Sequence, residues 1–329
     1  MSGKRPRDDE DLPAEKGSRL QRELSVFGLV NGGQKEKGRM VYSFGNYANY
    51  YLSYRHGKGT SQVPLDVRFQ MLEKVLPGGF RGKRCLDVGC NNGIPAIMLA
   101  CRFGAAWVVG VDIDYKLVNQ GSWLIRRMRM DVDWALSDPA RDSWHDELHS
   151  IREWLPSLSE TRETWENFEL DRLPGEAPIF PFNIELRTEN FVRSTTEQRR
   201  QQTTAFAGRF EFVSAFSLTK WLHLHYGDFG VKRLFELAHE LLVEGGHFAL
   251  EPQRWESYSN KKTAETRQTV LSIHLKPHQF HDYLVDQLHF TFVTVFVPSM
   301  GTFRQESNPS EEAFEGSSGF NRPIFVYRR

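Results

Sequence analysis

Apolar residues recur along this chain at two spacings, and the two spacings alternate in a regular order. Helices are expected where every third or fourth position is apolar, and buried strands where short apolar runs are bounded by glycine or charged residues. Pro77 and the two glycines after it end the first helix, and Gly104 ends the second. The elements predicted in this way are, in order, a helix from about 67 to 75, a strand over 84–88, a helix over 94–102, a strand over 106–114 and a helix over 117–128.

The alternation stops at about residue 130 and resumes near 182. The interval 130–181 holds tryptophans among many charged residues, and we interpret it as a partly helical insertion. Strands that alternate with helices are typical of a parallel sheet covered on both faces, so we predict one α/β domain over 41–329. Beyond the insertion the expected elements are strands over 183–191 and 210–217, a helix over 230–243, a strand over 247–252, a helix near 276–285, and two β-rich runs over 290–298 and 322–329 that should pair as an antiparallel hairpin.

Composition predicts a tail before this domain and excludes some classes of protein. The first 19 residues mix charges with few apolar side chains, and we expect a disordered, charged tail over 1–40. The 42 basic residues balance the 42 acidic residues, so any nucleic-acid site must be a local patch. No run approaches the roughly 18 apolar residues of a membrane span. The three cysteines form no metal-type CxxC pair. Three cysteines cannot all pair with one another and no signal peptide is recognised, which favours a reducing compartment.

The segment LDVGCNNG joins the first predicted strand to its helix and carries the first candidate chemistry. Gly89 and Gly93 allow a tight turn against a ligand, and the helix behind them supplies free backbone N–H groups. The spacing departs from the G-x-G-x-x-G of dinucleotide sites, and a carboxylate at Asp87 would repel a pyrophosphate but orient a cationic amine or sulfonium. Asp112, at the end of the second strand, can accept both hydroxyls of a ribose. The combination favours S-adenosylmethionine over a nicotinamide cofactor and predicts a Rossmann-like class I methyltransferase fold with a seven-stranded, mostly parallel sheet.

A second candidate site follows the strand that ends at Phe216, in the stretch SLTKWLHLHYGD. That strand should lie beside the first strand, so the connection after it should face the reactive methyl group. Lys220 and His223 lie there, close to the turn at Gly227-Asp228, where many methyltransferases place an acid or a proline-rich clamp. Cations hold an anion better than they deprotonate an amine, so these residues indicate an anionic acceptor such as a phosphate or carboxylate. A metal pair of His223 and His225 would need further ligands, for which the sequence shows no cluster with suitable spacing.

The same stretch, continued through GGHFALEPQRWESY, resembles the methylphosphate capping enzymes, the bicoid-interacting-protein-3 family of RNA methyltransferases. FGNYANYYLSYR is similar to the tyrosine-rich motif of that family, and GFNRPIFVY to its last strand. The resemblance runs from about Tyr42 to Tyr327, apart from the insertion. It implies transfer of a methyl group from S-adenosylmethionine to the terminal phosphate of an RNA 5′ end.

Carried over position by position, the resemblance implies roles for individual residues. Arg68 would pair with the methionine carboxylate in a bidentate contact, and Asp112 would hold the ribose. Asn190 would contact the edge of the adenine, and Phe191 would cover its face. The full set of implied cofactor contacts is Tyr51, Arg68, Gly89, Cys90, Asn91, Asp112, Ile113, Asn190, Phe191 and Phe216. The residues implied to face the RNA 5′ phosphates, and so to carry catalysis, are Tyr50, Lys220 and His223. The sequence departs from the family pattern at Asn49, Asn92 and Arg254, and Arg254 is a further candidate phosphate contact.

The sequence therefore predicts an RNA 5′-phosphate O-methyltransferase that acts on the γ-phosphate of a small structured RNA and forms a methylphosphate cap. A small nuclear RNA with a 5′ triphosphate end is the expected partner, ribonucleoprotein proteins are further candidates, and no membrane or metal is expected. The resemblance and the short basic cluster GKRPR indicate the nucleus. Two alternatives stay open. One is a methyltransferase of another acceptor, such as a 5′ monophosphate RNA or a protein, and the other is a ribonucleoprotein scaffold that binds RNA with dispensable catalysis.

Overall fold

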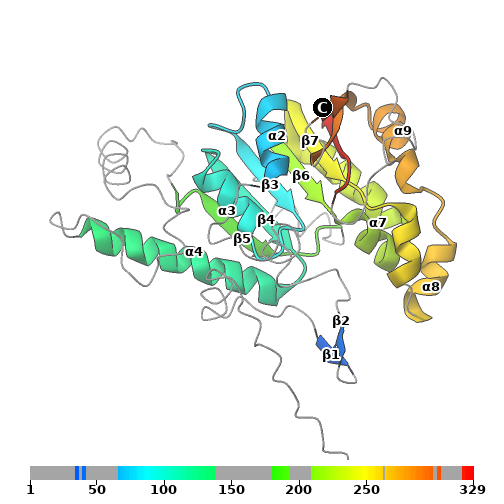
Figure 1. Cartoon of the computed structure of the whole chain (residues 1–329), viewed down its shortest axis with the longest axis horizontal. Helices are drawn as coiled ribbons and strands as arrows, with labels where there is room; N and C mark the ends of the chain where they lie inside the picture. The colour runs from blue at the N-terminus through cyan, green and yellow to red at the C-terminus, as the bar shows by residue number, and fades with distance from the viewer. Residues whose placement is uncertain are drawn as a thin grey trace, which may run out of the picture.

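The structure is a computed structural model that describes residues 34–36, 39–41, 66–137, 180–192, 209–261, 264–298, 302–304 and 321–329. Most of these residues form one mixed sheet or the helices that cover its two faces (Figure 1). The strands of this sheet, in spatial order, are β5 (Ile184–Thr188), β4 (Trp107–Asp112), β3 (Arg84–Val88), β6 (Phe210–Phe216), β7 (Leu242–Glu251), β10 (Ile324–Arg328), β8 (Thr291–Val297) and β9 (Thr302–Arg304).

The order and direction of the strands identify a class I methyltransferase fold. The five strands from β5 to β7 are parallel, with β3 between β4 and β6 as predicted. β10 is antiparallel to both of its neighbours, β7 and β8, so the predicted antiparallel pairing of the two C-terminal runs is confirmed. The short edge strand β9 pairs with β8 and extends the expected seven strands to eight.

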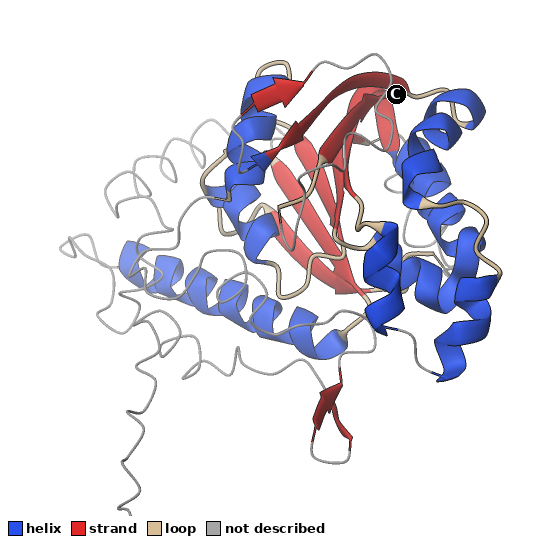
Figure 2. Ribbon diagram, turned by 45° about the vertical axis from the view of Figure 1, so that its right-hand side comes forward, coloured by secondary structure: helices blue, strands red, loops and turns tan. Residues whose placement is uncertain are grey.

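Helices cover the two faces of the sheet and enclose two hydrophobic cores (Figure 2). One face carries α2 (Val67–Val75), α3 (Ile94–Cys101) and α4 (Tyr115–Leu136). The other carries α7 (Thr219–Leu241) and the short pieces η4 (Pro277–Gln279), α9 (Phe280–Asp282) and η5 (Tyr283–Gln287). The 3₁₀ helix η3 (Trp255–Lys261) and α8 (Ala264–Leu271) pack beside α7 and form a third, smaller core with it.

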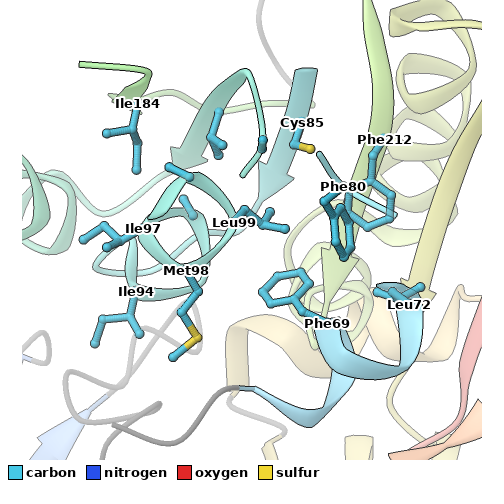
Figure 3. Packing of buried hydrophobic residues seen from close by; sticks show 14 of the residues in the cluster. Phe69, Leu72, Phe80, Cys85, Ile94, Ile97, Met98, Leu99, Ile184 and Phe212 are labelled. Atoms are coloured by element: carbon cyan, nitrogen blue, oxygen red, sulfur yellow. The ribbon is translucent and has the colours of Figure 1, made fainter. Parts of the chain in front are cut away.

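Aromatic rings fill much of the core beneath α2, as Figure 3 shows. Phe80 meets Phe212 edge to face, with ring centroids 5.0 Å apart, and meets Phe69 in the same way at 5.7 Å. Edge-to-face pairs place the positive ring edge on the negative ring face and add to the gain from burial. Many of the phenylalanines of this chain therefore pack in the hydrophobic core.

Some elements differ from the sequence prediction. α4 continues to Leu136, beyond the helix predicted over 117–128, because Met128 and Val132 extend its buried face. The helix expected near 276–285 is three short segments, and α8 was not predicted. The hairpin of β1 (Gln34–Glu36) and β2 (Arg39–Val41) lies in the region for which a disordered tail was expected. The rest of that region and residues 138–179 lie outside the described residues, so the domain boundaries stay predictions.

The largest difference concerns the stretch after β6. Residues 219–226 form the first part of α7. The sequence pattern predicted a connection there and a helix only from about residue 230. Gly227, with φ 59° and ψ −152°, interrupts α7 and separates residues 219–226 from the rest of the helix. Left-handed backbone of this kind favours glycine. The predicted turn at Gly227-Asp228 is therefore a kink within a helix.

Candidate active site at the carboxyl edge of the sheet

The glycine-rich turn lies where β3 ends, with its backbone bound to the neighbouring strand. The N–H groups of Gly89 and Cys90 both donate to the carbonyl oxygen of Val111, at 2.8 and 3.0 Å. Gly89 and Gly93 have φ of 78°, and Asn91 has φ of 57°. Three left-handed residues within five positions bend the chain sharply toward α3, so the predicted tight turn is present.

Asp112 fixes this turn from the adjacent strand. Its Oδ2 accepts from the backbone N–H of Asn91 and its Oδ1 from that of Asp114, each at 2.9 Å. A carboxylate has about four acceptor positions, so these bonds leave capacity for two hydroxyl groups. Burial raises the pKa of Asp112 to about 6, although the two backbone hydrogen bonds oppose the shift. The group is thus placed to hold a ribose diol in its ionised form near neutral pH.

A pocket whose empty space, part of it open to solvent, is about 530 Å³ lies beside this turn. The pocket brings together five of the predicted cofactor contacts: Gly89, Asp112, Ile113, Asn190 and Phe191. The remaining lining residues are Val88, Val111, Glu189, Val192, Leu218, Trp221, Leu222, His225 and Tyr226. A tight turn, an acid for a ribose and an apolar, aromatic wall fit the adenosine part of S-adenosylmethionine.

The far wall of this pocket comes from α7, which sequence reasoning missed. Leu218, Trp221, Leu222, His225 and Tyr226 recur at helical spacing, a signal that would have identified this face if the helix had been expected. The hydroxyl of Tyr226 accepts from Nδ2 of Asn190 at 3.0 Å, and so connects α7 to the residue expected to edge the adenine.

Asp87 lies beneath the turn, buried at the end of β3. Its Oδ1 accepts from Ser214 Oγ at 2.8 Å, whereas Oδ2 has no hydrogen-bond partner among the described residues. Burial raises its pKa to about 6, while Ser214 and Arg68 act in the opposite direction. A buried carboxylate oxygen without a partner favours a nearby cationic group, but Asp87 does not line the pocket, so its expected role toward the cofactor stays a prediction.

Arg68 lies in a buried network of carboxylates. Its guanidinium contacts Asp66 through Nε and Nη2, at 2.5 to 3.1 Å, and Glu251 through Nη1 at 3.0 Å. Its Cζ lies 4.4 Å from the centroid of Phe216. Asp66 thus makes the bidentate contact that the resemblance assigns to the cofactor carboxylate. Roles for Arg68 and Phe216 in cofactor binding stay predictions.

Two further predicted contacts, Cys90 and Asn91, belong to the turn but do not line the cavity. Cys90 is fully buried, and burial raises the pKa of its thiol well above its ordinary value. Asn91 is also buried, and its Oδ1 accepts from the backbone N–H of Asn92 at 2.9 Å. Tyr50 and Tyr51 lie outside the described residues, so their roles stay predictions.

Lys220 lies in the first turn of α7 and is largely buried. Its Nζ lies 5.3 Å from the ring centroid of Trp221, which lines the cofactor pocket. The lysine is therefore adjacent to the pocket and not part of its lining. Its expected contact with a phosphate stays a prediction.

His223 is fully buried, on the side of α7 that faces η3. Its Nδ1 lies 2.8 Å from the hydroxyl of Tyr258, and its Nε2 lies 3.8 Å from Asp228 Oδ1. Burial lowers the pKa of His223 to about 4, against the effect of Asp228, so the ring is neutral at pH 7. In the structure this side chain links α7 to η3 through its hydrogen bond with Tyr258. Its expected contact with the RNA phosphates stays a prediction.

Comparison with known proteins assigns this fold and site to a family. The sequence profile of Bicoid-interacting protein 3 (Bin3) matches residues 210–329. A probable RNA methyltransferase from Arabidopsis thaliana is 32% identical over 299 residues, which cover 90% of this chain and 83% of the plant protein. This chain belongs to the Bicoid-interacting protein 3 family.

Other relatives in this family carry more specific names. The 7SK snRNA methylphosphate capping enzyme of Mus musculus is 30% identical over 306 residues, which cover 89% of this chain. This chain spans only 42% of the length of the mouse enzyme. The U6 snRNA methylphosphate capping enzyme Amus of Drosophila melanogaster is 26% identical over 305 residues, which cover 91% of this chain and 79% of the fly protein.

The N-methyltransferase NodS of Bradyrhizobium japonicum aligns over 80% of this chain and 94% of its own, with a TM-score of 0.43 and 10% identity. Family, strand order and pocket together make this chain a methyltransferase whose cofactor is S-adenosylmethionine. Within the described segments, no group of three or more His, Cys, Asp or Glu side chains is arranged to hold a metal ion. No helix described there has the length and apolar character needed to cross a membrane.

Proposed function

We propose that this enzyme transfers the methyl group of S-adenosylmethionine to the 5′ γ-phosphate of a small structured RNA. The observation that carries the proposal is the place of Lys220, in the first turn of the helix that forms the far wall of the cofactor pocket. In α/β folds of this type, the acceptor approaches at the carboxyl edge of the sheet, where β6 ends. The names of the mouse and fly relatives, which are snRNA methylphosphate capping enzymes, support the same acceptor.

The residues next to Lys220 in the sequence favour an anionic acceptor. No acidic residue occurs between Ser217 and Gly227, and Asp228 beyond them is bound to the backbone N–H groups of His274 and Leu275, at 3.1 to 3.2 Å. An amine acceptor would need a base to take up its proton. A phosphate oxygen is already an anion near neutral pH and needs none.

The chemistry asked of the protein is therefore alignment. When bound, S-adenosylmethionine would supply an electrophilic methyl group to the phosphate oxygen, and its sulfur would leave as a neutral thioether with the electrons of the broken carbon–sulfur bond. Asp112 and the wall of α7 fix the position of the donor, and Lys220 holds the acceptor oxygen and offsets its charge. Positioning of two reactants and fixed charges at the reacting atoms are large sources of rate enhancement.

The substrate is tested with one RNA sequence made in three forms, carrying a 5′ triphosphate, a 5′ monophosphate or a 5′ hydroxyl. Methyl transfer from a labelled donor to the triphosphate form alone is expected. Transfer only to the monophosphate form, or to protein, would replace this proposal by the corresponding acceptor. RNA binding without any transfer would support a scaffold role instead.

The role of Lys220 is tested with Lys220→Ala in single-turnover methyl transfer. We expect a loss of roughly 10–100-fold, the scale of one charge-assisted contact, with unchanged affinity for S-adenosylmethionine. His223→Ala should lower the rate less. Lys232→Ala is a matched control, because Lys232 lies on the same helix beyond the kink and its Nζ lies 5.6 Å from the ring centroid of Tyr283. Equal rates for Lys220→Ala and wild type, or loss of cofactor binding instead, would contradict the assignment.

The proposal extends to location and partners. Enzymes named for snRNA substrates are consistent with a nuclear role and with a ribonucleoprotein as the binding partner. The test is the cellular distribution of the tagged full chain, and the RNA and protein recovered with it.

A further inference from the structure

A side chain from another strand shapes the connection between β6 and α7. The N-cap residue of α7, Leu218, makes no side-chain hydrogen bond to the free N–H groups of the first turn. Gln253, two residues beyond β7, takes that place. Its Oε1 accepts from the backbone N–H of Lys220 and from Thr219 Oγ1, each at 3.0 Å. Its Nε2 donates to the carbonyl oxygen of Ser217, so one buried amide binds three of four consecutive residues.

The backbone at this connection needs such restraint. Ser217 has φ of 59°, in the left-handed region that non-glycine residues seldom adopt. Its N–H donates to the carbonyl oxygen of Glu251 at 2.9 Å, and its Oγ accepts from Arg322 Nη1 at 2.8 Å. The strained residue is thus held on several sides. Strain of this kind persists where the surrounding structure determines it, often at functional sites.

The segment 219–226 is also fixed on its two sides. Toward η3, His223 bonds to the hydroxyl of Tyr258, which is fully buried. On the opposite side, Trp221 and Tyr226 line the cofactor pocket. The amide of Gln253 fixes the start of this segment. A change at Gln253 should therefore move Lys220 more than it moves the pocket wall.

We infer that Gln253 is a positioning residue for the acceptor site, which sets the place of Lys220 relative to the methyl donor. The inference rests on the proposed function, because it takes Lys220 as the group that holds the RNA phosphate. Glutamine suits the position because it supplies an acceptor and a donor together. Methionine, of similar length, supplies neither group, and glutamate supplies only the acceptor.

The test uses the full chain and measures binding by fluorescence anisotropy to one RNA with either a 5′ triphosphate or a 5′ hydroxyl. Wild type is expected to prefer the triphosphate form by about ten-fold or more, the scale of one charge-assisted contact. Gln253→Met should abolish most of this preference and leave the affinity for S-adenosylmethionine within about two-fold. Gln279→Met is the matched control, because Gln279 Oε1 accepts from the backbone N–H of Lys276 at 2.9 Å in exposed η4. This control should behave as wild type.

A double-mutant cycle on the single-turnover rate separates positioning from general structure. If Gln253 acts through Lys220, Gln253→Met should not slow transfer further in a Lys220→Ala background. Losses that multiply would overturn the inference, as would a Gln253→Met variant that keeps the triphosphate preference. If wild type itself shows no such preference and transfers no methyl, the proposed function and the inference both fail. If Gln253→Met does not fold by circular dichroism, Gln253→Glu replaces it, with an intermediate loss expected and an unchanged preference counting against the inference.

Discussion

The replacement Asp87→Asn removes one ionisable group from beneath the cofactor turn and keeps its size. In wild type, Oδ1 accepts from Ser214 at 2.8 Å, and an asparagine oxygen can accept the same bond. Burial raises the pKa of the folded Asp87 to about 6, from an ordinary value of 3.8. The folded protein therefore binds this proton more tightly than the unfolded chain does.

The direction of the pH effect follows from this difference. A carboxyl group whose pKa is raised on folding stabilises the fold at low pH, and this contribution is lost as the pH rises through about 6. Between pH 7 and pH 5, proton uptake by folded Asp87 should raise the free energy of unfolding of wild type by roughly 1 kcal/mol relative to Asp87→Asn. The other titrating groups are common to both proteins and largely cancel in the comparison, although the Asp87 charge also raises the pKa of Asp112, as the last of the causes of that shift.

The assay is urea unfolding of both proteins without cofactor at pH 5, 6 and 7. The difference in unfolding free energy should change steadily in favour of wild type as the pH falls. Glu211→Gln is the control. Burial acts to raise the pKa of Glu211, but the hydrogen bonds and the charge of Arg84 together outweigh this effect, so the pKa lies below its ordinary value. That control should show a nearly constant difference over the same range. A constant difference for Asp87→Asn would refute the reasoning, because it would mean that Asp87 titrates alike in the folded and unfolded chain.

Three further predictions concern the turn, the ribose acid and the tail. Asp112→Ala should weaken S-adenosylmethionine binding by about 1.5–3 kcal/mol in a protein that still folds, and unchanged affinity in calorimetry would contradict this. Gly93→Ala should lower the unfolding free energy by roughly 1–3 kcal/mol, because φ is 78° and a Cβ there would collide with Leu186; an unchanged urea midpoint would count against it. A chain that starts near Arg39 should keep methyl transfer to short RNA, and a second chain that starts at Gly33 keeps the β1–β2 hairpin as its comparison. Loss of activity in a folded Arg39 chain alone would place the hairpin in the site.

The sequence predicted the part of the site that residues close together in the chain form. The cofactor turn and Asp112 follow from an apolar strand, a glycine pair and a second strand, and the structure places them as expected. The start of α7 carries a helical spacing, but the place of its first turn could not be predicted in the same way, because Gln253, 33 residues beyond Lys220, holds it. The partners of Arg68 show the same limit, since Glu251 is 183 residues away. Contacts of this range depend on the sheet order, which periodicity alone does not specify.

The position of β10 also has a consequence for chains that end early. β10 lies between β7 and β8, although it follows both of them in the sequence. A chain that ends before residue 324 lacks the strand that pairs with both β7 and β8, so each of these strands keeps an unpaired edge. A chain that ends before Arg322 also lacks the hydrogen bond from Arg322 to Ser217 at the start of α7. The last residues of the sequence thus join the two halves of the sheet and support the connection that follows β6.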